Sequence, residues 1–239
     1  MAFDAATVKC FVHEAEKNLI NSRIDKIYQP QKDEICLSLR STVSNTKLYV
    51  SANPNYPRIY FSSEKTENPT VAPMFCMLLR KHLSSGRITG ISQYEFERIV
   101  KIEIESFNEL LELTKKHLYI ELLGKFSNII LTDADDRIID SIKRIDISTS
   151  SLRQVLPGLT YKFPPKQEKI NPISNDMTLN LIESIDLSES EIMNKLYGIS
   201  KVIARELIYQ SNKNDKFSAF SEGYIGEVKD RLTKKELEL

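Results

Sequence analysis

The feature that most restricts the fold of this chain is the strict alternation of apolar and polar residues in Arg98–Glu105, RIVKIEIE. Successive side chains of an extended segment point to opposite faces, so Val100, Ile102 and Ile104 share one face and mostly charged residues share the other. Shorter runs of strand-forming residues recur between turn residues, a pattern typical of hairpins and meanders. We expect further strands at residues 23–29, 34–40, 47–51, 58–61, 117–122, 128–132 and 138–142.

Two helices are expected to introduce the two groups of strands. Apolar residues recur on one helical face of residues 4–20, and Asp4 stands where a side chain can cap the first amide groups. Pro73 opens a second helix at 73–84, and Gly86 ends it. This order predicts an α+β fold in which a two-layer antiparallel β-sandwich is flanked by two helices.

The composition changes at about residue 152. The stretch LPGLTYKFPPKQEKINPIS at 156–174 contains four prolines, which predicts a surface strap or linker. Beyond it the periodicity is helical. The clearest helical segments are 179–185, 188–196 and 200–209, and the charged tail 227–239 is expected to begin a longer helix. We therefore expect one domain over residues 1–170 and an all-α domain over 171–239.

The segment KLYGISKVIARELIY at 195–209 is typical of two helices joined by a tight turn. One helix is expected to end at Gly198, and Ser200 is expected to cap the next. In a helix-hairpin-helix motif the exposed amide groups of such a turn bind a phosphate, which makes Gly198 and Ser200 candidate phosphate contacts. An ordinary tight αα-hairpin explains the same pattern.

The sequence contains no pattern for catalysis or for cofactor binding. It has neither a G-x-x-x-x-G-K-S/T loop nor a G-x-G-x-x-G fingerprint, and His13, His82 and His117 lack metal-ligand spacing. We expect a protein that is not an enzyme and that binds no cofactor and no metal. The 33 basic and 33 acidic residues balance, but basic residues exceed acidic ones over residues 1–90, where an anionic ligand is expected to bind.

The cysteines and the N-terminal residues indicate the compartment. Cys10, Cys36 and Cys76 form neither an even disulfide framework nor a metal-binding spacing, so we expect buried thiols in a reducing environment. The first residues, MAFDAATVKCFVHEAEK, are too charged for a signal peptide. No apolar stretch approaches the roughly 20 residues needed to cross a bilayer. A cytoplasmic protein without a membrane partner is expected.

Eight ordered segments in residues 1–165 resemble the N-terminal domain of the NFACT family, which is named partly for bacterial fibronectin-binding proteins. The family includes ribosome-quality-control factors that add C-terminal tails to stalled chains. The segments are MAFD at 1–4, RIDKIYQP at 23–30, SANPNYPRIY at 51–60, APMFCMLLRKHLSSGRI at 72–88, ERIVKIEI at 97–104, GKFSNIILTD at 124–133, IIDSIKRI at 138–145 and VLPGLTYKFPP at 155–165. Residues 175–239 fit the helix-hairpin-helix region that follows in the family, and we expect the chain to be truncated before a coiled coil.

The resemblance implies a fold similar to the N-terminal domain of formamidopyrimidine-DNA glycosylase. It does not imply that enzyme's activity, because those glycosylases use an N-terminal proline amine as nucleophile. This chain begins with Met1-Ala2-Phe3 and contains no Cys-x-x-Cys pair.

The resemblance further implies binding of tRNA and of a large ribosomal subunit carrying peptidyl-tRNA, with charged tRNA, chiefly alanyl, recruited for C-terminal tailing. The family residues tied to tailing are an N-terminal aspartate, matched by Asp4, and an Asp-Arg pair, matched by Glu97 and Arg98. Glutamate at 97 adds a methylene, which leaves open whether tailing is preserved. Arg98 is expected to stack on an unpaired base, or to pair with a phosphate or a guanine.

Two further sets of expectations accompany this interpretation. Sequence-independent phosphate contacts are predicted at Arg23, Lys26, Arg80, Lys81 and Arg87, and solvated surface charge is the alternative for each of them. The other functions to be considered are a fibronectin-binding adhesin, which adds a minor cell-surface pool and fibronectin as a partner, and a DNA-binding protein on a glycosylase-like scaffold without glycosylase activity.

Overall fold

The structure is a computed structural model that describes residues 3–41, 45–64, 67–165, 168–171 and 188–214 of the 239. The chain forms two compact units. The sheet unit comprises Glu14–Tyr94 and Ile99–Pro164, and the helical unit comprises Met1–His13, Glu95–Arg98 and Pro165–Leu239. The units are therefore interleaved in sequence, whereas composition predicts a single division at residue 170.

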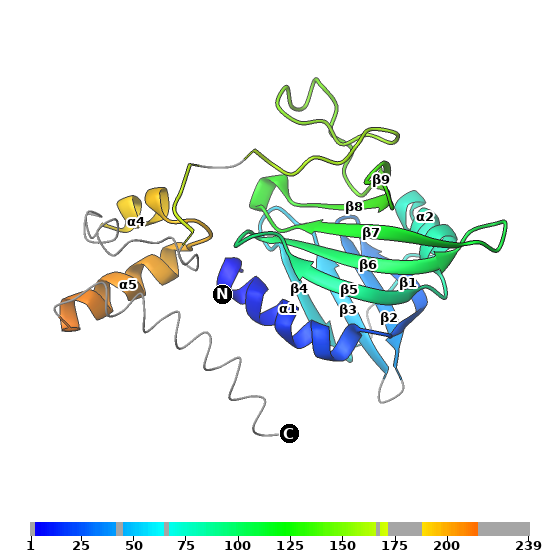
Figure 1. Ribbon diagram of the computed structural model, residues 1–239, viewed down its shortest axis with the longest axis horizontal. Helices are drawn as coiled ribbons and strands as arrows, with labels where there is room; N and C mark the ends of the chain where they lie inside the picture. The colour runs from blue at the N-terminus through cyan, green and yellow to red at the C-terminus, as the bar shows by residue number, and fades with distance from the viewer. Residues whose placement is uncertain (1–2, 42–44, 65–66, 166–167, 172–187, 215–239) are drawn as a thin grey trace. The chain divides into compact units, whose positions relative to one another are not determined.

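The sheet unit contains nine antiparallel strands in one continuous sheet, in the order β4-β3-β2-β1-β5-β6-β7-β8-β9 (Figure 1). The strands are β1 (Arg23–Gln31), β2 (Glu34–Arg40), β3 (Asn45–Ser51), β4 (Arg58–Ser62), β5 (Arg87–Gln93), β6 (Ile99–Phe107), β7 (Leu113–Glu121), β8 (Asn128–Asp133) and β9 (Ile138–Ser141). The antiparallel character is confirmed. The expected separation into two sheets is wrong, because β1 pairs with β2 on one side and with β5 on the other.

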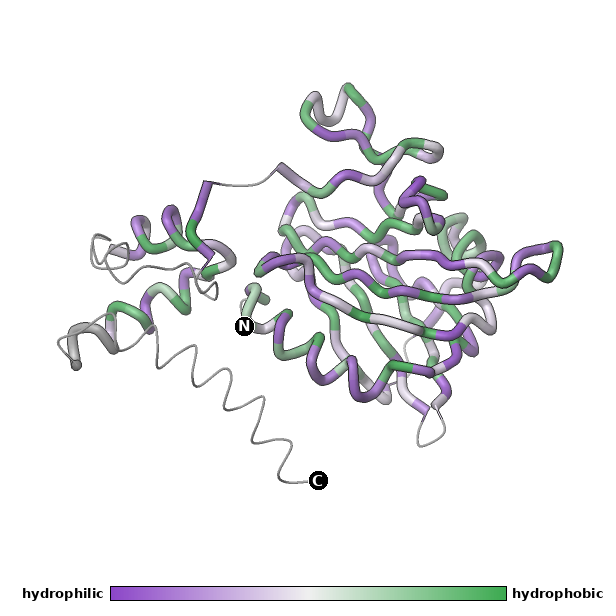
Figure 2. The backbone as a smooth tube through the Cα atoms, viewed as in Figure 1, coloured by the Kyte–Doolittle hydropathy of each residue, from purple (hydrophilic) through white to green (hydrophobic). Residues whose placement is uncertain are grey.

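Burial along the strands shows where the core of the sheet unit lies. Runs of consecutive buried residues occur in β2, β7 and β8. Because successive side chains alternate between faces, such runs require both faces of these strands to be covered. Figure 2 shows apolar residues distributed along these strands. Helix α2 (Met74–Leu83), which occupies the predicted segment, contacts β1, β6 and β9 through a buried apolar face.

Strand β5 was not predicted from the sequence. Its residues, RITGISQ, include a glycine and several small polar side chains, which obscure the alternation on which the other strand predictions rest. The register with β6 also shifts between Ile88 and Gly90, so the period of two is broken inside the strand.

The predicted surface strap is wrong for its first part. Tyr161 is buried in an apolar cluster with Tyr119 and with Val155, which precedes the predicted strap, and Phe163 packs against the same cluster. The Tyr161 ring stacks on Tyr119 at 3.9 Å between centroids, and Phe163 stacks on Tyr94 at 3.6 Å. This segment belongs to the core because its aromatic residues cover the sheet.

The helical unit contains the first part of α1 (Ala5–Leu19) together with α4 (Glu189–Lys195) and α5 (Lys201–Asn214). The apolar face predicted for α1 is buried along the helix, from Val8 to Leu19. Helices α4 and α5 pack through a cluster centred on Ile192, Leu196, Ala204 and Leu207. The helices expected at 179–185 and 227–239 lie outside the described residues.

Candidate nucleic-acid interface

Asp4 caps the N-terminus of α1 and is buried. Its Oδ1 accepts hydrogen bonds from the backbone N and from the Oγ1 of Thr7, both at 2.9 Å. The first amide groups of a helix have no partner within the helix, and the Asp4 carboxylate satisfies the one at Thr7 and faces the positive end of the helix dipole.

Ser200 caps the N-terminus of α5 in the same way. Its Oγ accepts from the Ile203 amide at 3.3 Å, and its backbone O accepts from the Ala204 amide at 2.9 Å. The same hydroxyl donates to the second carboxylate oxygen of Asp4 at 2.9 Å. The starts of α1 and α5 are therefore joined through one carboxylate, which accepts three hydrogen bonds.

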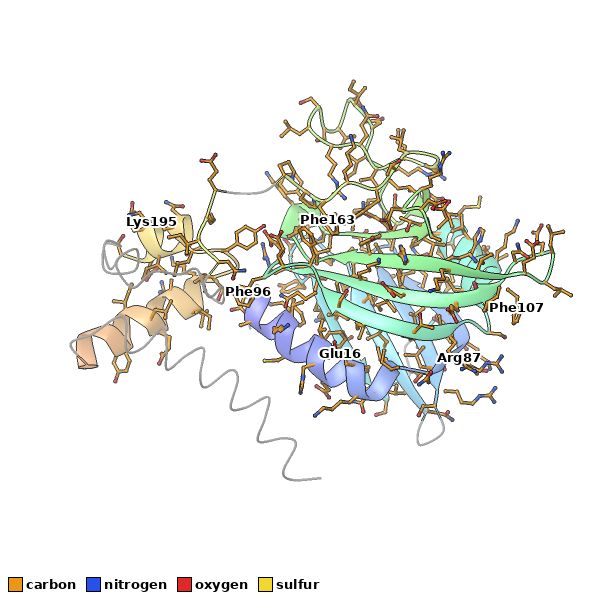
Figure 3. All side chains as sticks on the ribbon, viewed as in Figure 1. Glu16, Arg87, Phe96, Phe107, Phe163 and Lys195 are labelled. Carbon is orange, nitrogen blue, oxygen red and sulfur yellow. The ribbon has the colours of Figure 1, made fainter. Side chains whose placement is uncertain are left out.

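Gly198 allows this junction to close. Its φ of +67° lies in the left-handed region, and its carbonyl accepts from the Ala5 amide at 3.2 Å. A Cβ at this position would lie 2.5 Å from the Ala5 Cβ and 2.6 Å from the Phe96 carbonyl oxygen. Phe96, which lies beside the start of α1 (Figure 3), forms a buried apolar cluster with Ala5, Ala6 and Tyr197.

Glu97 and Arg98 follow Phe96 directly, so the same cluster holds them in the helical unit. Glu97 Oε2 accepts from the Arg98 backbone N at 3.1 Å. The Arg98 side chain is half-buried, and its guanidinium forms no hydrogen bond or ion pair with the residues that the structure describes. Its five N–H groups remain available to a ligand.

The structure thus brings five of the predicted site residues into one unit: Asp4, Glu97, Arg98, Gly198 and Ser200. Sequence reasoning missed Phe96 and Tyr197, which form the apolar contact beneath them. The only local signal for Phe96 is an aromatic residue between two charged positions, and nothing in the sequence connects it with Gly198.

The five basic side chains among the predicted phosphate contacts belong to the sheet unit, and two of them already have partners. Arg80 donates through Nε to the Ile27 carbonyl at 2.8 Å, and Lys81 Nζ lies 2.9 Å from Glu109 Oε1 in an exposed ion pair. Arg23 and Lys26 are exposed on β1, and Arg87 is exposed on β5, opposite Arg23.

Thiols and metal ligands offer no competing site in the described ranges. Burial raises the pKa of the Cys36 and Cys76 thiols, which makes them poor nucleophiles at neutral pH. Cys10 is exposed on α1, so the expectation of a buried thiol is wrong there. The described residues contain no cluster of metal-ligating side chains, and none of the described helices is long and apolar enough to cross a membrane.

Comparison with known proteins identifies the family to which this chain is similar. A family model of the NFACT N-terminal and middle domains matches residues 4–235. A Bacillus subtilis protein named Rqc2 homolog RqcH is 38% identical over 220 residues, which cover 90% of this chain and 39% of that protein. Its Streptococcus pneumoniae namesake is matched over 43% of its length, so the chain spans about two fifths of these curated relatives.

Solved structures show the same fold. The N-terminal domain of the fibronectin-binding protein PavA from Streptococcus pneumoniae superimposes with a TM-score of 0.84 at 34% identity, covering 92% of this chain and 83% of that one. The N-terminal part of the fibronectin/fibrinogen-binding protein of Streptococcus suis gives a TM-score of 0.84 at 32% identity, covering 92% and 85%. With a family model matching nearly its whole length, the chain belongs to the NFACT family.

Proposed function

We propose that this chain is the RNA-binding part of a cytoplasmic ribosome-quality-control factor. It binds tRNA together with a large ribosomal subunit that carries a stalled nascent chain, and it brings charged tRNA, chiefly alanyl, for C-terminal tailing. The protein acts by recruitment and positioning and is not itself an enzyme. The relatives named Rqc2 homolog RqcH support this assignment.

The observation that carries the proposal is the half-buried guanidinium of Arg98, which has no protein partner among the described residues. The N–H groups of this guanidinium gain charge-assisted hydrogen bonds when a base or a phosphate approaches. A guanidinium can stack on an unpaired base or form two parallel hydrogen bonds with a phosphate or a guanine. Single-stranded RNA loops present all of these groups.

A binding titration tests the proposal. The chain is expected to bind tRNA more tightly than duplex DNA of equal length, with affinity that falls steeply as salt rises. Arg98→Ala should weaken tRNA binding about 5- to 150-fold, the equivalent of about 1–3 kcal/mol. The matched control is Arg137→Ala, which removes an exposed arginine of the sheet unit. Unchanged affinity of the Arg98 variant would remove that residue from the site.

Binding of an extracellular protein is the second candidate, because the two solved structures come from proteins described as binding fibronectin or fibrinogen. Capture of fibronectin at nanomolar concentration, surviving moderate salt, would favour it over the proposal. Equal affinity for tRNA and duplex DNA would instead favour a DNA-binding protein on a glycosylase-like scaffold.

A further inference from the structure

Three arginines form a row across neighbouring strands of the sheet unit. Arg23 on β1 lies directly opposite Arg40 on β2 and directly opposite Arg87 on β5. Residues directly opposite on adjacent strands project from the same face of a sheet. All three side chains are exposed. We call Arg40, Arg23 and Arg87 the arginine row.

Directly opposite residues of an antiparallel sheet form two kinds of pair, and Arg23 and Arg87 form the kind whose side chains start closer together. The flanking residues carry the hydrogen bonds: the Ile24 amide donates to the Gly86 carbonyl at 2.9 Å, and the Ile88 amide donates to the Ser22 carbonyl at 3.0 Å. Arg23 and Arg87 are therefore a non-hydrogen-bonded pair, for which the two side chains start closest together. Like charges at directly opposite positions destabilise a sheet.

Basic side chains outnumber acidic ones around the arginine row. Among the described residues no carboxylate forms an ion pair with any arginine of the row. Glu105 on β6 lies directly opposite Arg87 and shares its face of the sheet, but it also lies 3.9 Å from Lys115 Nζ. Asp25 occupies the register shift after Ile24. Lys26, three residues along β1 from Arg23, is exposed and adds a fourth cation to this part of the sheet.

We infer that the arginine row binds the phosphodiester backbone of RNA. The inference rests on the proposed function, since it takes RNA as the ligand. Planar guanidinium groups suit phosphate oxygens, and contacts to the backbone hold a nucleic acid in place without reading its sequence. Bound phosphates remove the repulsion that the free protein carries, so the unfavourable pairing of Arg23 with Arg87 is relieved in the complex.

An anionic membrane is a less suitable partner for this surface. Peripheral membrane binding combines basic residues with apolar side chains or lipid anchors that enter the bilayer. The exposed large apolar residues that the structure describes all lie outside β1, β2 and β5. The arginine row is a cationic surface without apolar neighbours on its own strands.

Salt-dependent binding tests the inference. Arg23→Gln, Arg40→Gln and the double variant are titrated with tRNA and with an RNA duplex that has no loop, over a range of salt concentrations. Each substitution should lower the slope of log affinity against log salt by about 1 and weaken binding to both RNAs alike. The control is Arg137→Gln, an exposed arginine between β8 and β9 with Asp133, Asp135 and Asp136 beside it, which should keep the wild-type slope.

Thermal unfolding provides an independent readout. Without RNA and at low salt, Arg23→Gln should raise the unfolding temperature by about 1–3 °C, because it removes repulsion with both neighbours. The gain should shrink at high salt, where exposed charges are screened. A lower unfolding temperature, or a slope equal to that of wild type on both RNAs, would overturn the inference.

The two RNAs separate this inference from the proposed function. If the row variants keep the preference for tRNA and also the wild-type slope of log affinity against log salt, the inference about the arginine row is overturned and the proposed function is left standing. If the arginine substitutions weaken binding to both RNAs and the wild-type protein shows no preference for tRNA, the inference about the arginine row is supported and the proposed function is contradicted. Row-dependent binding to phosphatidylglycerol vesicles in the absence of RNA binding overturns the assignment of RNA as the ligand.

Discussion

The hydroxyl of Ser200 donates a hydrogen bond to the carboxylate of Asp4, at 2.9 Å and across 196 positions of sequence. The other carboxylate oxygen of Asp4 accepts two further hydrogen bonds, from the backbone N and the Oγ1 of Thr7. Because Asp4 is buried and already accepts three hydrogen bonds, it is best understood as a positioning residue that joins the starts of two helices. This differs from a direct contact with RNA, and the two roles can be separated by mutation.

Asp4→Ala should destabilise the helical unit by about 2 kcal/mol, because α1 loses its cap and Ser200 loses its acceptor. Asp4→Asn should cost less than about 1 kcal/mol, because the amide oxygen still caps α1 and the amide nitrogen can donate to Ser200. Hydrogen exchange at amides of α1 and α5 measures both effects, and the two helix starts should open together in Asp4→Ala. Loss of tRNA binding without faster exchange would identify Asp4 as a ligand contact.

Gly198→Ala should disrupt the junction between Ala5 and Phe96. The new methyl would require movement of two backbone segments and would also strain a left-handed φ, so a loss of about 3 kcal/mol or more is expected. Gly158→Ala is the matched control, because Gly158 has a φ of +86° but no atom within 4 Å of the added Cβ. It should show the backbone cost alone, about 1–2 kcal/mol. Equal losses in the two variants would contradict the close packing at Gly198.

These contacts mark the limit of what the sequence predicts. Alternation in β6 and shorter strand-forming runs between turn residues predicted eight of the nine strands, because both patterns are local, whereas β5 is hidden by Gly90 and by polar neighbours. Composition assigned Tyr161 to a surface strap because prolines flank it, although its ring stacks on Tyr119. Nothing local connects Asp4 with Ser200 or Arg23 with Arg87. Such pairs depend on tertiary contacts and on strand register, which a single sequence does not specify.

Arg153 links the segment that contains Tyr161 to strand β7 of the sheet. Its guanidinium donates to both oxygens of Glu121, at 3.0 and 2.6 Å, and Glu121 is fully buried. In a Tyr161→Phe background, which removes the third partner of the carboxylate, Arg153→Met should cost about 3–5 kcal/mol because a buried charge is left unpaired. Adding Glu121→Leu should recover most of that loss. Urea denaturation measures the free energy of unfolding of each variant. Additive losses from Arg153→Met and Glu121→Leu would contradict a coupled pair.

The stability of the sheet unit should depend on pH through Asp140. Burial alone would raise the pKa of Asp140, but hydrogen bonds from Arg144 and from the Ser141 amide outweigh it and hold the pKa below its usual value. A lowered pKa stabilises the folded state above the unfolded pKa of about 3.9, and this contribution is lost as pH falls through the folded pKa. Asp140→Asn should therefore be less stable than wild type above pH 5, by a margin that shrinks below pH 4.

Unfolding midpoints measured from pH 6 to pH 2 check this prediction. Asp135→Asn, an exposed substitution in the turn before β9, is the control and should follow the wild-type curve. A constant difference between wild type and Asp140→Asn across the range would show that the pair with Arg144 contributes no pH dependence.

At position 97 this chain has glutamate where the family resemblance implies aspartate. The Oε2 of Glu97 accepts from the Arg98 backbone N at 3.1 Å, a local contact that a shorter aspartate can also make. Glu97→Asp moves the carboxylate by roughly 1–1.5 Å and keeps its charge, so tRNA affinity should stay within about 3-fold of wild type.

Glu97→Gln keeps the length and removes the charge, and should weaken binding about 10-fold if base amines or 2′-hydroxyls donate to the carboxylate. A large loss in Glu97→Asp with none in Glu97→Gln would show that reach matters at this position and charge does not. Glutamate and aspartate would then not be interchangeable beside Arg98, and the tailing role carried over from the family would lose its support at this residue.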